Sequence, residues 1–404
     1  MIKKMNFRES RDLLLSHIVP VASEKLPLDR LFGRILAEDV KAGMNVPHYD
    51  RSPLDGYAVR SSDTKSAGRD SPVTLKVIGE IRAGDSPDLI PGSGEAVKIL
   101  TGAPVPEGAD AVIRYEDTKF SEDYVTVCEQ LLPDQNIIRA GEDVRAGDVI
   151  ATRGMHVDLA VVGMLASQGM AEASVHKRLK VAVICTGNEI AEVGTALAGS
   201  QIYNSNRHML AAALARDGYE AEYMGCAGDD TEQIAGLLLR ALGDHDAVVL
   251  TGGVSAGDYD LVPEALERIG ADIMVHGVKI KPGMACVYGF YRHKPCIALS
   301  GNPASALTNY YCIASSLLKK YSGAADYVPE LIRVTVKSNF GKKGGGERIL
   351  RGSMRIDDGM VCMYPSCEQG NVVISSLRAA DLFVIVPEDH GPVKENDVLD
   401  GFLI

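Results

Sequence analysis

The sequence contains no tryptophan and only seven phenylalanines among its 404 residues, and its charge is unbalanced toward acid. Proteins that coat single-stranded nucleic acid stack bases on aromatic side chains, and so few large rings make such a platform hard to build. The 54 acidic residues outnumber the 42 basic ones, which gives a formal net charge of -12. A net acidic surface argues against nucleic acid or an anionic membrane as the main partner. It leaves room for a local basic pocket that binds a small anion.

Long apolar runs are also missing. No stretch of about 18 apolar residues occurs, so no transmembrane helix is expected. The segment MIKKMNFRESRDLLL at the N-terminus carries charges and a run of only three leucines, which is too short for the apolar part of a signal peptide. We therefore expect a cytoplasmic protein with no membrane partner.

Cysteine is present but in no metal-binding pattern. None of the eight cysteines forms a CxxC pair, and no spacing of histidine and cysteine resembles a zinc site. Several lie inside apolar runs such as VAVICTG, which are typical of buried strands. We interpret them as buried free thiols in a reducing compartment.

The length predicts two to four domains, and the 46% of hydrophobic residues is ordinary for a globular protein. Residues 1–20 have the apolar spacing of one amphipathic helix that Pro20 ends, and residues 26–40 show a short helical pattern. Between 47 and 147, short β-like runs alternate with Gly, Pro and Asp turns, which indicates a small all-β domain. A helix is expected within 148–177.

Strands and helices alternate clearly between residues 178 and 327. KVAVICTG, EAEYMGCAG and DAVVLTGG read as strands that are each followed by a helix, and the run after Pro303 reads as another helix. This alternation predicts an α/β layer with a mostly parallel sheet. Residues 328–404 are rich in β-like runs and Gly-dense loops. The fold class expected from the residues is therefore multidomain α/β plus β.

Acidic residues follow three consecutive strands of the α/β stretch. Glu189 follows the first, Asp229 follows the second, and Asp258 and Asp260 follow the third. Ligands bind beyond the carboxyl ends of strands in open α/β sheets, so these side chains are expected to converge. Carboxylates without a matching His or Cys suit Mg²⁺, which implies a phosphate-bearing partner. The alternative is that Asp229 and Asp260 only cap helices, although a capping aspartate can also hold a metal.

Two further groups point to anion binding. The glycines of TGGVSAGDYD, Gly252, Gly253 and Gly257, permit close approach of the backbone to a phosphate, although the run matches neither the dinucleotide nor the P-loop motif. Lys279, Lys281 and the helix start at SGNPAS offer a second anion site, to which donors from 348–378 would add. The alternative for the two lysines is a solvated strand edge. On these features alone, the chain reads as a nucleotide-dependent α/β enzyme of unknown substrate.

The third candidate lies in the all-β stretch. Asp55 precedes Gly56 in a turn between apolar segments, and Thr101, Glu142 and Asp143 lie in similar turns. A turn aspartate is usually structural, through hydrogen bonds to its own backbone, and that alternative stays open.

Seven motifs follow one another along the chain: PLDGYAV, TGAPVPEGADAV, GEDVRAGD, VICTGNEI, TGGVSAGDYD, KPG and SGNPAS. In order and spacing the chain resembles the molybdopterin molybdenumtransferases, the MoeA proteins of bacteria and the corresponding domains of a plant protein and of animal gephyrin. The resemblance covers essentially the whole chain. Each motif is weak alone, but seven in order over some 250 residues are specific.

The resemblance implies an elongated subunit of four domains. These are a MogA-like α/β domain for the molybdopterin or nucleotide, an inserted β-rich domain, a small linking domain and a C-terminal β-barrel. It also implies a homodimer with the active site at the subunit interface. The expected bounds are 1–21 and 178–327 for the α/β domain, 22–46 and 148–177 for the linking domain, 47–147 for the inserted domain and 328–404 for the barrel.

The implied activity belongs to molybdenum cofactor biosynthesis. The enzyme takes adenylylated molybdopterin and molybdate, cleaves the pyrophosphate-type bond with the help of Mg²⁺, releases AMP and leaves molybdenum on the dithiolene. The implied partners are a MogA-type molybdopterin adenylyltransferase and molybdoenzyme-maturation proteins. No covalent nucleophile is needed, because the substrate's own sulfurs bind molybdenum.

Site residues follow from the resemblance position by position. Those that look catalytic are Asp55, Thr101 and Asp143 on the inserted domain, with Glu189, Asp229 and Asp260 on the α/β domain, the last three also being the metal ligands. Those that look like binding residues for the cofactor and the oxyanion are Gly252, Gly253, Ser255, Gly257, Lys279, Lys281, Asn302, Pro303, Ser305, Arg351 and Ser376.

Three departures from the family pattern bear on activity. The family's KPGKP reads KPGMA, with Met284 in place of a lysine that contacts the oxyanion and Ala285 in place of proline. The family's LPGNP reads LSGNP with Ser300, and the segment 342–352 is looser than usual. Lys279 is a candidate substitute for the missing lysine. Two alternatives therefore stand beside the transferase: an inactive paralogue that serves as a pterin-nucleotide scaffold, and a variant that inserts tungstate.

Overall fold

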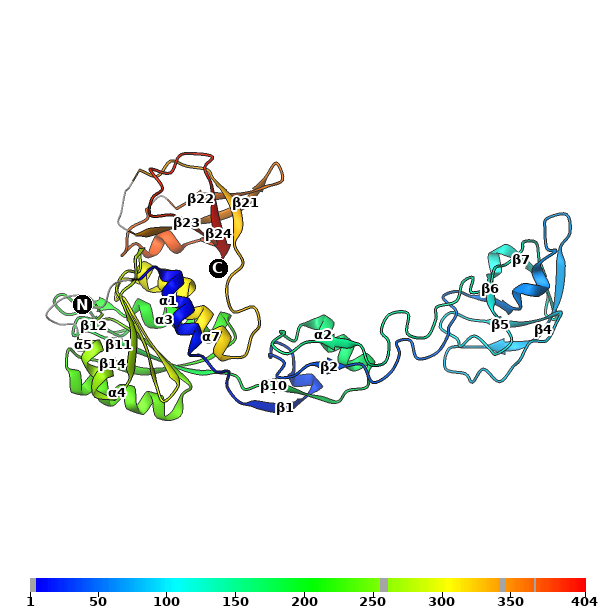
Figure 1. The fold of residues 1–404 in the computed structure, drawn as a ribbon, viewed down its shortest axis with the longest axis horizontal. Helices are drawn as coiled ribbons and strands as arrows, with labels where there is room; N and C mark the ends of the chain where they lie inside the picture. Colours follow the sequence, from blue (N-terminus) through cyan, green and yellow to red (C-terminus); the bar gives the residue numbers. More distant parts are fainter. Residues whose placement is uncertain (1–4, 255–260, 342–345, 367) are drawn as a thin grey trace.

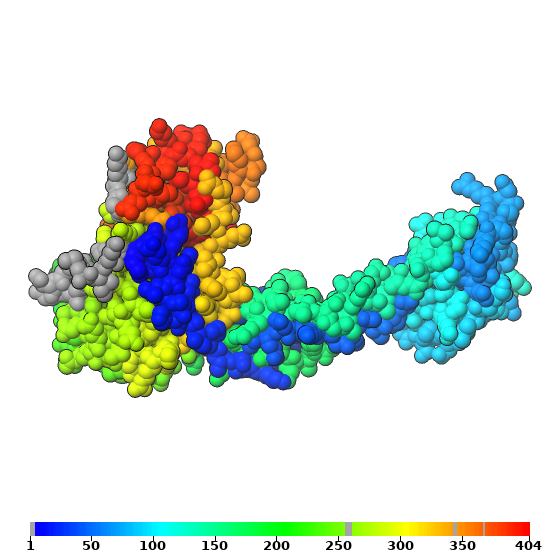
Figure 2. All heavy atoms as spheres, viewed as in Figure 1, coloured from blue at the N-terminus to red at the C-terminus, as the bar shows by residue number. Residues whose placement is uncertain are grey.

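A computed structural model describes residues 5–254, 261–341, 346–366 and 368–404. The subunit is elongated (Figure 1): the α/β part and the C-terminal part lie together at one end, and the β-rich part stands alone at the other. A slender waist joins the two ends in the space-filling view of Figure 2. The expected class, multidomain α/β plus β, is confirmed. No helix among the described residues is long and apolar enough to cross a membrane.

A six-stranded sheet forms the centre of the α/β part. Its strand order is β14-β11-β15-β19-β18-β16; β14, β11, β15 and β19 are parallel, and β18 pairs antiparallel with both β19 and the edge strand β16. The inner strands read as near-continuous apolar runs because helices cover both faces. The bounds are β11 Lys180–Thr186, β14 Glu220–Ala227, β15 Ala247–Thr251, β16 Asp272–His276, β18 Cys286–Tyr291 and β19 Lys294–Leu299.

Two apolar clusters pack against this sheet. One contains side chains of α1, α3 and the helical run after Pro303, and the other contains side chains of α4 and α5. The run after Pro303 is continuous but passes through a π-helical segment at Tyr310–Ala314. The helices are α1 Phe7–Ser16, α3 Ser205–Arg216, α4 Thr231–Asp244, α5 Leu261–Arg268, α6 Pro303–Asn309 and α7 Ser315–Tyr321.

Helix caps explain where these helices begin. Asn6 and Glu9 form a capping box at α1, which ends at Ser16, four residues before the expected stop at Pro20. At α4 the capping side chain is Asp230, which accepts a hydrogen bond from the Gln233 backbone. Capping therefore does not account for Asp229.

The C-terminal part is a closed barrel. Five strands pair in the cycle β21-β22-β20-β24-β23 and back to β21. The short strand β17, from the α/β part, adds to this barrel by pairing Lys281 with Arg348. The bounds are β17 Ile280–Lys281, β20 Ile332–Val336, β21 Glu347–Asp357, β22 Met360–Pro365, β23 Leu382–Val386 and β24 Val398–Leu403, with a 3₁₀ turn η5 at Ile374–Leu377.

The distant β-rich part holds a six-stranded sheet in the order β6-β3-β5-β4-β8-β7. Apolar clusters lie on both of its faces, one around Tyr57 and Leu75 and the other around Ile81 and Ile99. The bounds are β3 Gly56–Val59, β4 Val73–Ile81, β5 Glu95–Ile99, β6 Ala111–Arg114, β7 Thr118–Phe120 and β8 Tyr124–Val127.

The chain passes through the waist twice, once toward the β-rich part and once back. β1 (Ser23–Pro27) pairs with β10 (Glu172–His176), β2 (Val40–Lys41) pairs with β9 (Val149–Ala151), and helix α2 (Leu159–Ser167) packs beside them. The short helix expected within 26–40 is wrong. Only the 3₁₀ turn Leu28–Arg30 forms there, because β1 takes up the preceding residues and Leu31 and Leu36 pack against the residues of α2.

Candidate active site

A cavity of about 640 Å³ opens at the carboxyl edge of the central sheet. Loops that follow the four parallel strands β14, β11, β15 and β19 line it, which is where ligands of open α/β sheets bind. Its size falls within the range of small-molecule sites. The predicted residues that line it are Glu189, Asp229, Gly252, Gly253, Lys281, Asn302, Pro303 and Ser305.

The carboxylates stand at one end of this row of loops. Glu189 follows β11 and Asp229 follows β14, and Asn188 links the two loops by donating to Asp229 Oδ2 at 2.9 Å. Both carboxylates act on one nearby thiol: partial desolvation of its sulfur raises the pKa of Cys226 to about 11, and Glu192, Glu189 and Asp229 add to the shift. Negative charge is therefore concentrated at this end of the cavity.

The predicted metal ligands are only partly placed. Glu189 and Asp229 line the same cavity and offer the oxygen donors that Mg²⁺ prefers. Asp260 lies outside the described residues, as do Ser255 and Gly257. Within the described residues no three His, Cys, Asp or Glu side chains gather closely enough to hold a metal ion. Two carboxylates with open positions suit a cation that keeps several waters and binds a substrate phosphate.

The glycine turn after β15 forms the middle of the cavity wall. Gly252 has a φ of 101°, and a Cβ there would lie 2.5 Å from both the carbonyl oxygen and Oγ1 of Thr186. Gly253 has a φ of 62°, and a Cβ there would lie 2.9 Å from Val262 Cγ2. Only glycine fits at these two positions, so the wall exposes backbone rather than side chain.

The far end of the row carries the cation and the hydroxyl. Lys281 is half-buried on β17, and Ser305 is buried in the first turn of α6. Met284 also lines this end and is 39% exposed. Charges of opposite sign thus occupy opposite ends of one cavity.

Lys279 does not take part in this cavity. It lines a second cavity of about 530 Å³ together with Glu9 and Glu347. Its backbone explains the placement, because its N–H bonds to the carbonyl of Met5 and its carbonyl accepts from the N–H of Glu347. The suggestion that Lys279 replaces the missing lysine is therefore not supported by its position.

Arg351 and Ser376 lie behind the rim rather than on it. The guanidinium contacts the segment before η5: Arg351 Nη2 donates to the Gly370 carbonyl at 3.2 Å, and the neighbouring Asn371 lines the cavity. Arg351 is fully buried, and its Nε and Nη1 have no hydrogen-bond partner among the described residues. Burial, together with Arg348, lowers the pKa of Arg351 to about 10. Ser376 sits in η5 and donates to the Val373 carbonyl at 2.6 Å.

Sequence reasoning missed several polar residues of the cavity, among them Thr186, Thr251 and Asn206. Thr186 and Thr251 each end a buried strand, and Asn206 lies in the first turn of α3. A signal for the two threonines was present, because both strand ends read Thr-Gly. Asn206 had no comparable signal, since an asparagine near a helix start reads as a cap.

Of the remaining predicted residues, Asp55 lies directly before β3 and Thr101 shortly after β5, in the distant β-rich part, and Asp143 lies between β8 and β9, where its backbone N–H donates to the Val46 carbonyl. All three are exposed. Thr101 donates from its backbone N–H and from Oγ1 to the same Asp55 oxygen, at 2.7 and 2.8 Å. These two bonds, with a smaller effect of Lys98, lower the pKa of Asp55.

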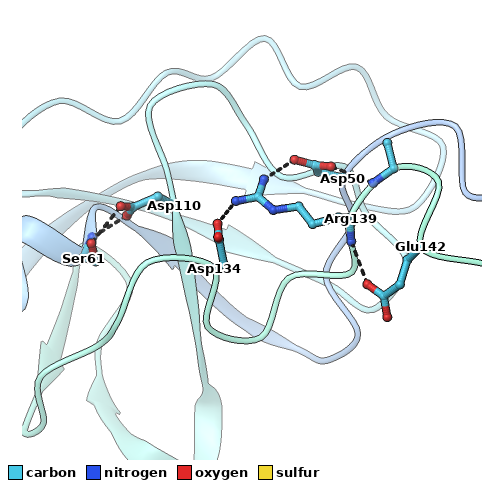
Figure 3. A network of polar contacts seen from close by, with 7 residues as sticks. Asp50, Ser61, Asp110, Asp134, Arg139 and Glu142 are labelled. Carbon is cyan, nitrogen blue, oxygen red and sulfur yellow. Dashed lines mark hydrogen bonds and ion pairs between the residues drawn. The ribbon is translucent and has the colours of Figure 1, made fainter.

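A polar network positions the loop that leads to Asp143 (Figure 3). Arg139 pairs with Asp50 and Asp134, and its backbone N–H donates to Glu142 at 3.0 Å. Asp50 also accepts from the Ala140 backbone at 2.8 Å. The loops that carry Asp55 and Asp143 are thus tied together by their own chain.

Comparison with known families covers almost the whole chain. Residues 5–169 match the MoeA N-terminal region (domain I and II), residues 182–320 match a probable molybdopterin binding domain, and residues 333–402 match the MoeA C-terminal region (domain IV). The chain belongs to the MoeA family of molybdopterin molybdenumtransferases.

Individual relatives agree with this membership. The chain is 32% identical to the molybdopterin molybdenumtransferase of Staphylococcus aureus strain COL over 93% of its length and 90% of the relative's, and 31% identical to that of Staphylococcus epidermidis over 99% and 95%. The crystal structure of a molybdopterin biosynthesis MoeA protein from Pyrococcus horikoshii superposes with a TM-score of 0.84 at 31% identity, covering 99% of both chains.

Proposed function

We propose that this protein inserts molybdate into adenylylated molybdopterin with release of AMP, aided by Mg²⁺, and that it acts as a homodimer. Family membership makes it a molybdopterin molybdenumtransferase of molybdenum cofactor biosynthesis. One observation supports the detailed reaction: the carboxylates Glu189 and Asp229 and the donors Lys281 and Ser305 line opposite ends of one cavity. A substrate that joins a pyrophosphate to a molybdate-accepting dithiolene needs both kinds of group within one site.

The carboxylate end serves the phosphoanhydride. Glu189 and Asp229 would hold Mg²⁺, with Asp260 as the third ligand, and the ion when bound offsets the charge of the pyrophosphate. Water adds across the anhydride bond, so that AMP departs with one phosphate and the pterin keeps the other. The backbone of Gly252 and Gly253 lets the phosphates approach closely because no Cβ intervenes.

The opposite end serves the oxyanion. Molybdate is a dianion, and charge-assisted hydrogen bonds from Lys281 and Ser305 would orient it. Arg351 supports this role, because its guanidinium is fully buried and two of its nitrogens have no partner among the described residues, which is costly unless an anion joins it. Ser376 lies in the same segment, but its single hydroxyl hydrogen is already donated to the Val373 carbonyl, so the proposed donors are Lys281, Ser305 and Arg351.

A homodimer accounts for the distant residues. The sheet that Asp55 and Thr101 flank stands at the opposite end of the subunit from the α/β part (Figure 1), and Asp143 lies on the segment that leads back from it, so none of the three lines the cavity of its own chain. A second copy that lies antiparallel would bring its β-rich part to the cavity, which makes the interface part of the site. Size-exclusion chromatography with light scattering is expected to give twice the mass of the 43.2 kDa chain. A monomer that is fully active would refute the shared site.

The proposed reaction also implies the proteins that supply its substrate and accept its product. An adenylyltransferase of the MogA type must supply the adenylylated pterin, and proteins that load molybdoenzymes must accept the product. Both are proposed partners, and nucleic acid and membranes are not.

The test is AMP release from adenylylated molybdopterin with and without molybdate. The transferase predicts release that depends on molybdate and on Mg²⁺, and that falls strongly in Asp229→Asn. Met284 lines the oxyanion end and favours two alternatives to the molybdate-inserting enzyme. Faster release with tungstate than with molybdate would identify a tungstate-inserting variant, and pterin-nucleotide binding without release for either anion would identify a scaffold.

A further inference from the structure

Asn206 is held in one orientation on the cavity floor. Its Nδ2 donates to Thr251 Oγ1 at 2.7 Å and to the Gly301 carbonyl at 2.8 Å. Thr251 Oγ1 in turn donates its single hydrogen to the Ser300 carbonyl at 3.0 Å, so it can only accept from Asn206. A flipped amide would set Oδ1 against the Gly301 carbonyl oxygen. Both N–H groups are therefore used, and Oδ1 is fixed as an acceptor.

That acceptor has no partner among the described residues, and neither does the hydroxyl of Thr186. Both residues line the cavity, and both are more than nine-tenths buried, at 8% and 4% exposure. Leaving a buried polar atom without a hydrogen bond costs about 1–3 kcal/mol. Two such atoms on one cavity floor indicate that a ligand satisfies them.

The two atoms flank the glycine turn. A Cβ on Gly252 would lie 2.5 Å from Thr186 Oγ1, and a Cβ on Gly301 would lie 3.7 Å from Gly252 Cα. The absence of a side chain at Gly252 leaves room beside the Thr186 hydroxyl. Neither Asn206 nor Thr186 is charged, so this floor differs from both ends of the cavity, where carboxylates and a lysine stand.

We propose that Asn206 and Thr186 form a specificity site for the amino-bearing edge of a nitrogen heterocycle. Oδ1 of Asn206 accepts from the exocyclic amine, and the hydroxyl of Thr186 donates to a neighbouring ring nitrogen or carbonyl oxygen. This inference rests on the proposed function, whose substrate carries two rings with such an edge, adenine and pterin. The shared chemistry is an N–H donor beside an acceptor.

The test compares ligands that differ only at this edge. AMP is paired with purine riboside 5′-monophosphate, and 6-hydroxymethylpterin with 6-hydroxymethyl-lumazine, and each is titrated calorimetrically into the full-length protein. A site that hydrogen-bonds an amine rejects the analogue that lacks it, so one of the two pairs is expected to differ by about 10- to 100-fold in affinity. The pair that differs identifies the ring.

Variants connect that preference to the two residues. Thr186→Val keeps the shape of a buried strand residue and removes only the hydroxyl, and Asn206→Ala removes the acceptor. Both are expected to reduce the preference to less than about threefold, while thermal melting shows that they fold. Thr335→Val makes the same change at a buried position of the barrel and should keep the full preference.

Equal binding within both pairs, no binding of either pair, or a preference that survives in folded Asn206→Ala would overturn the inference. These results do not depend on turnover. A wild-type protein that discriminates within one pair yet releases no AMP with molybdate refutes the proposed reaction and keeps the specificity site. A protein that turns over but does not discriminate refutes only the specificity site.

Discussion

Exposed carboxylates mark both ends of this subunit, but their surroundings differ. Glu189 and Asp229 line a cavity whose wall also holds buried polar atoms of Thr186 and Asn206 that have no partner among the described residues, and the buried Arg351 behind it has two more. In the β-rich part, Asp55 is already satisfied by Thr101. Only one unpartnered buried atom, Tyr115 Oη, is found among its described residues. One end is built to be completed by a ligand, and the other is preorganised by its own chain.

The largest effect is expected from Gly252→Ala, which fills the middle of the cavity wall. The added Cβ would lie 2.5 Å from two atoms of Thr186, and the φ of 101° strains any residue with a side chain. Molybdate-dependent AMP release should fall by more than about 100-fold, because displacement by about 1 Å is enough for such a loss. The free energy of unfolding should drop by about 1–3 kcal/mol.

Gly236→Ala is the matched control for this change. Gly236 lies in α4, has no positive φ and would set its Cβ in open space. Activity should stay at the wild-type level and stability should rise slightly, by about 0.5–1 kcal/mol. If Gly252→Ala keeps full activity, the glycine turn is not where the substrate approaches.

Complementation tests whether the two ends meet across a dimer. Asp229→Asn damages the cavity end and Asp143→Asn damages the β-rich end, and each homodimer is expected to lose about 100-fold in AMP release. When the two variants are co-expressed, half of the dimers are hybrids in which one site carries both defects and the other carries none. Activity should then return to roughly a quarter of the wild-type rate. No recovery in hybrids isolated with two affinity tags would show that one chain supplies the whole site.

The strands and the parallel sheet of the α/β part could be predicted from the sequence because their signals are local. Buried strands such as Lys180–Thr186 are continuous apolar runs, and the parallel arrangement follows from their alternation with helices. The same reasoning failed at 26–40, where a helical spacing of leucines serves a small core shared with α2. Packing between segments more than 100 residues apart decides that stretch, and no local pattern reports it.

The residues of the candidate site also fall into those that local patterns predict and those that long-range contacts place. Residues in strand-end loops, such as Glu189, Asp229 and Gly252, were predictable because parallel strands bring their carboxyl ends together. Lys279 was misplaced because its backbone pairs with Met5 and Glu347, which are remote in sequence. Asn206 was missed because its role depends on bonds to Thr251 and Gly301 that only the folded chain creates.

Arg351→Met should separate stability from anion binding. Arg351 has no ion pair within the part of the chain that the structure describes, and a buried cation without a counter-ion costs stability, so replacing it with an apolar side chain of similar size should raise the free energy of unfolding by about 1–3 kcal/mol. The folded-state pKa of Arg351, about 10, lies below the ordinary value of an arginine, so this cost is present at pH 7 and declines as the pH rises through about 10. Molybdate should raise the melting temperature of the wild type and not that of the variant. A variant that loses stability but still responds to molybdate would place the oxyanion elsewhere.

The smallest effect is expected in the β-rich part, from Thr101→Val. The substitution removes the Oγ1 bond to Asp55 and keeps the backbone N–H bond, so the pKa of Asp55 should rise toward its ordinary value without reaching it. A carboxyl group with a depressed pKa stays ionised to lower pH, so the acid limb of the pH profile of AMP release should move to higher pH in the variant. At pH 7 the group is ionised in both proteins, so AMP release there should change by less than about twofold. NMR titration of labelled aspartates checks the pKa directly. Thr74→Val, which breaks only a contact with Thr126 on the same sheet, should leave the Asp55 titration unchanged. If the acid limb stays in place while the Asp55 titration moves, Asp55 is not part of the site that its ordering by Thr101 suggests.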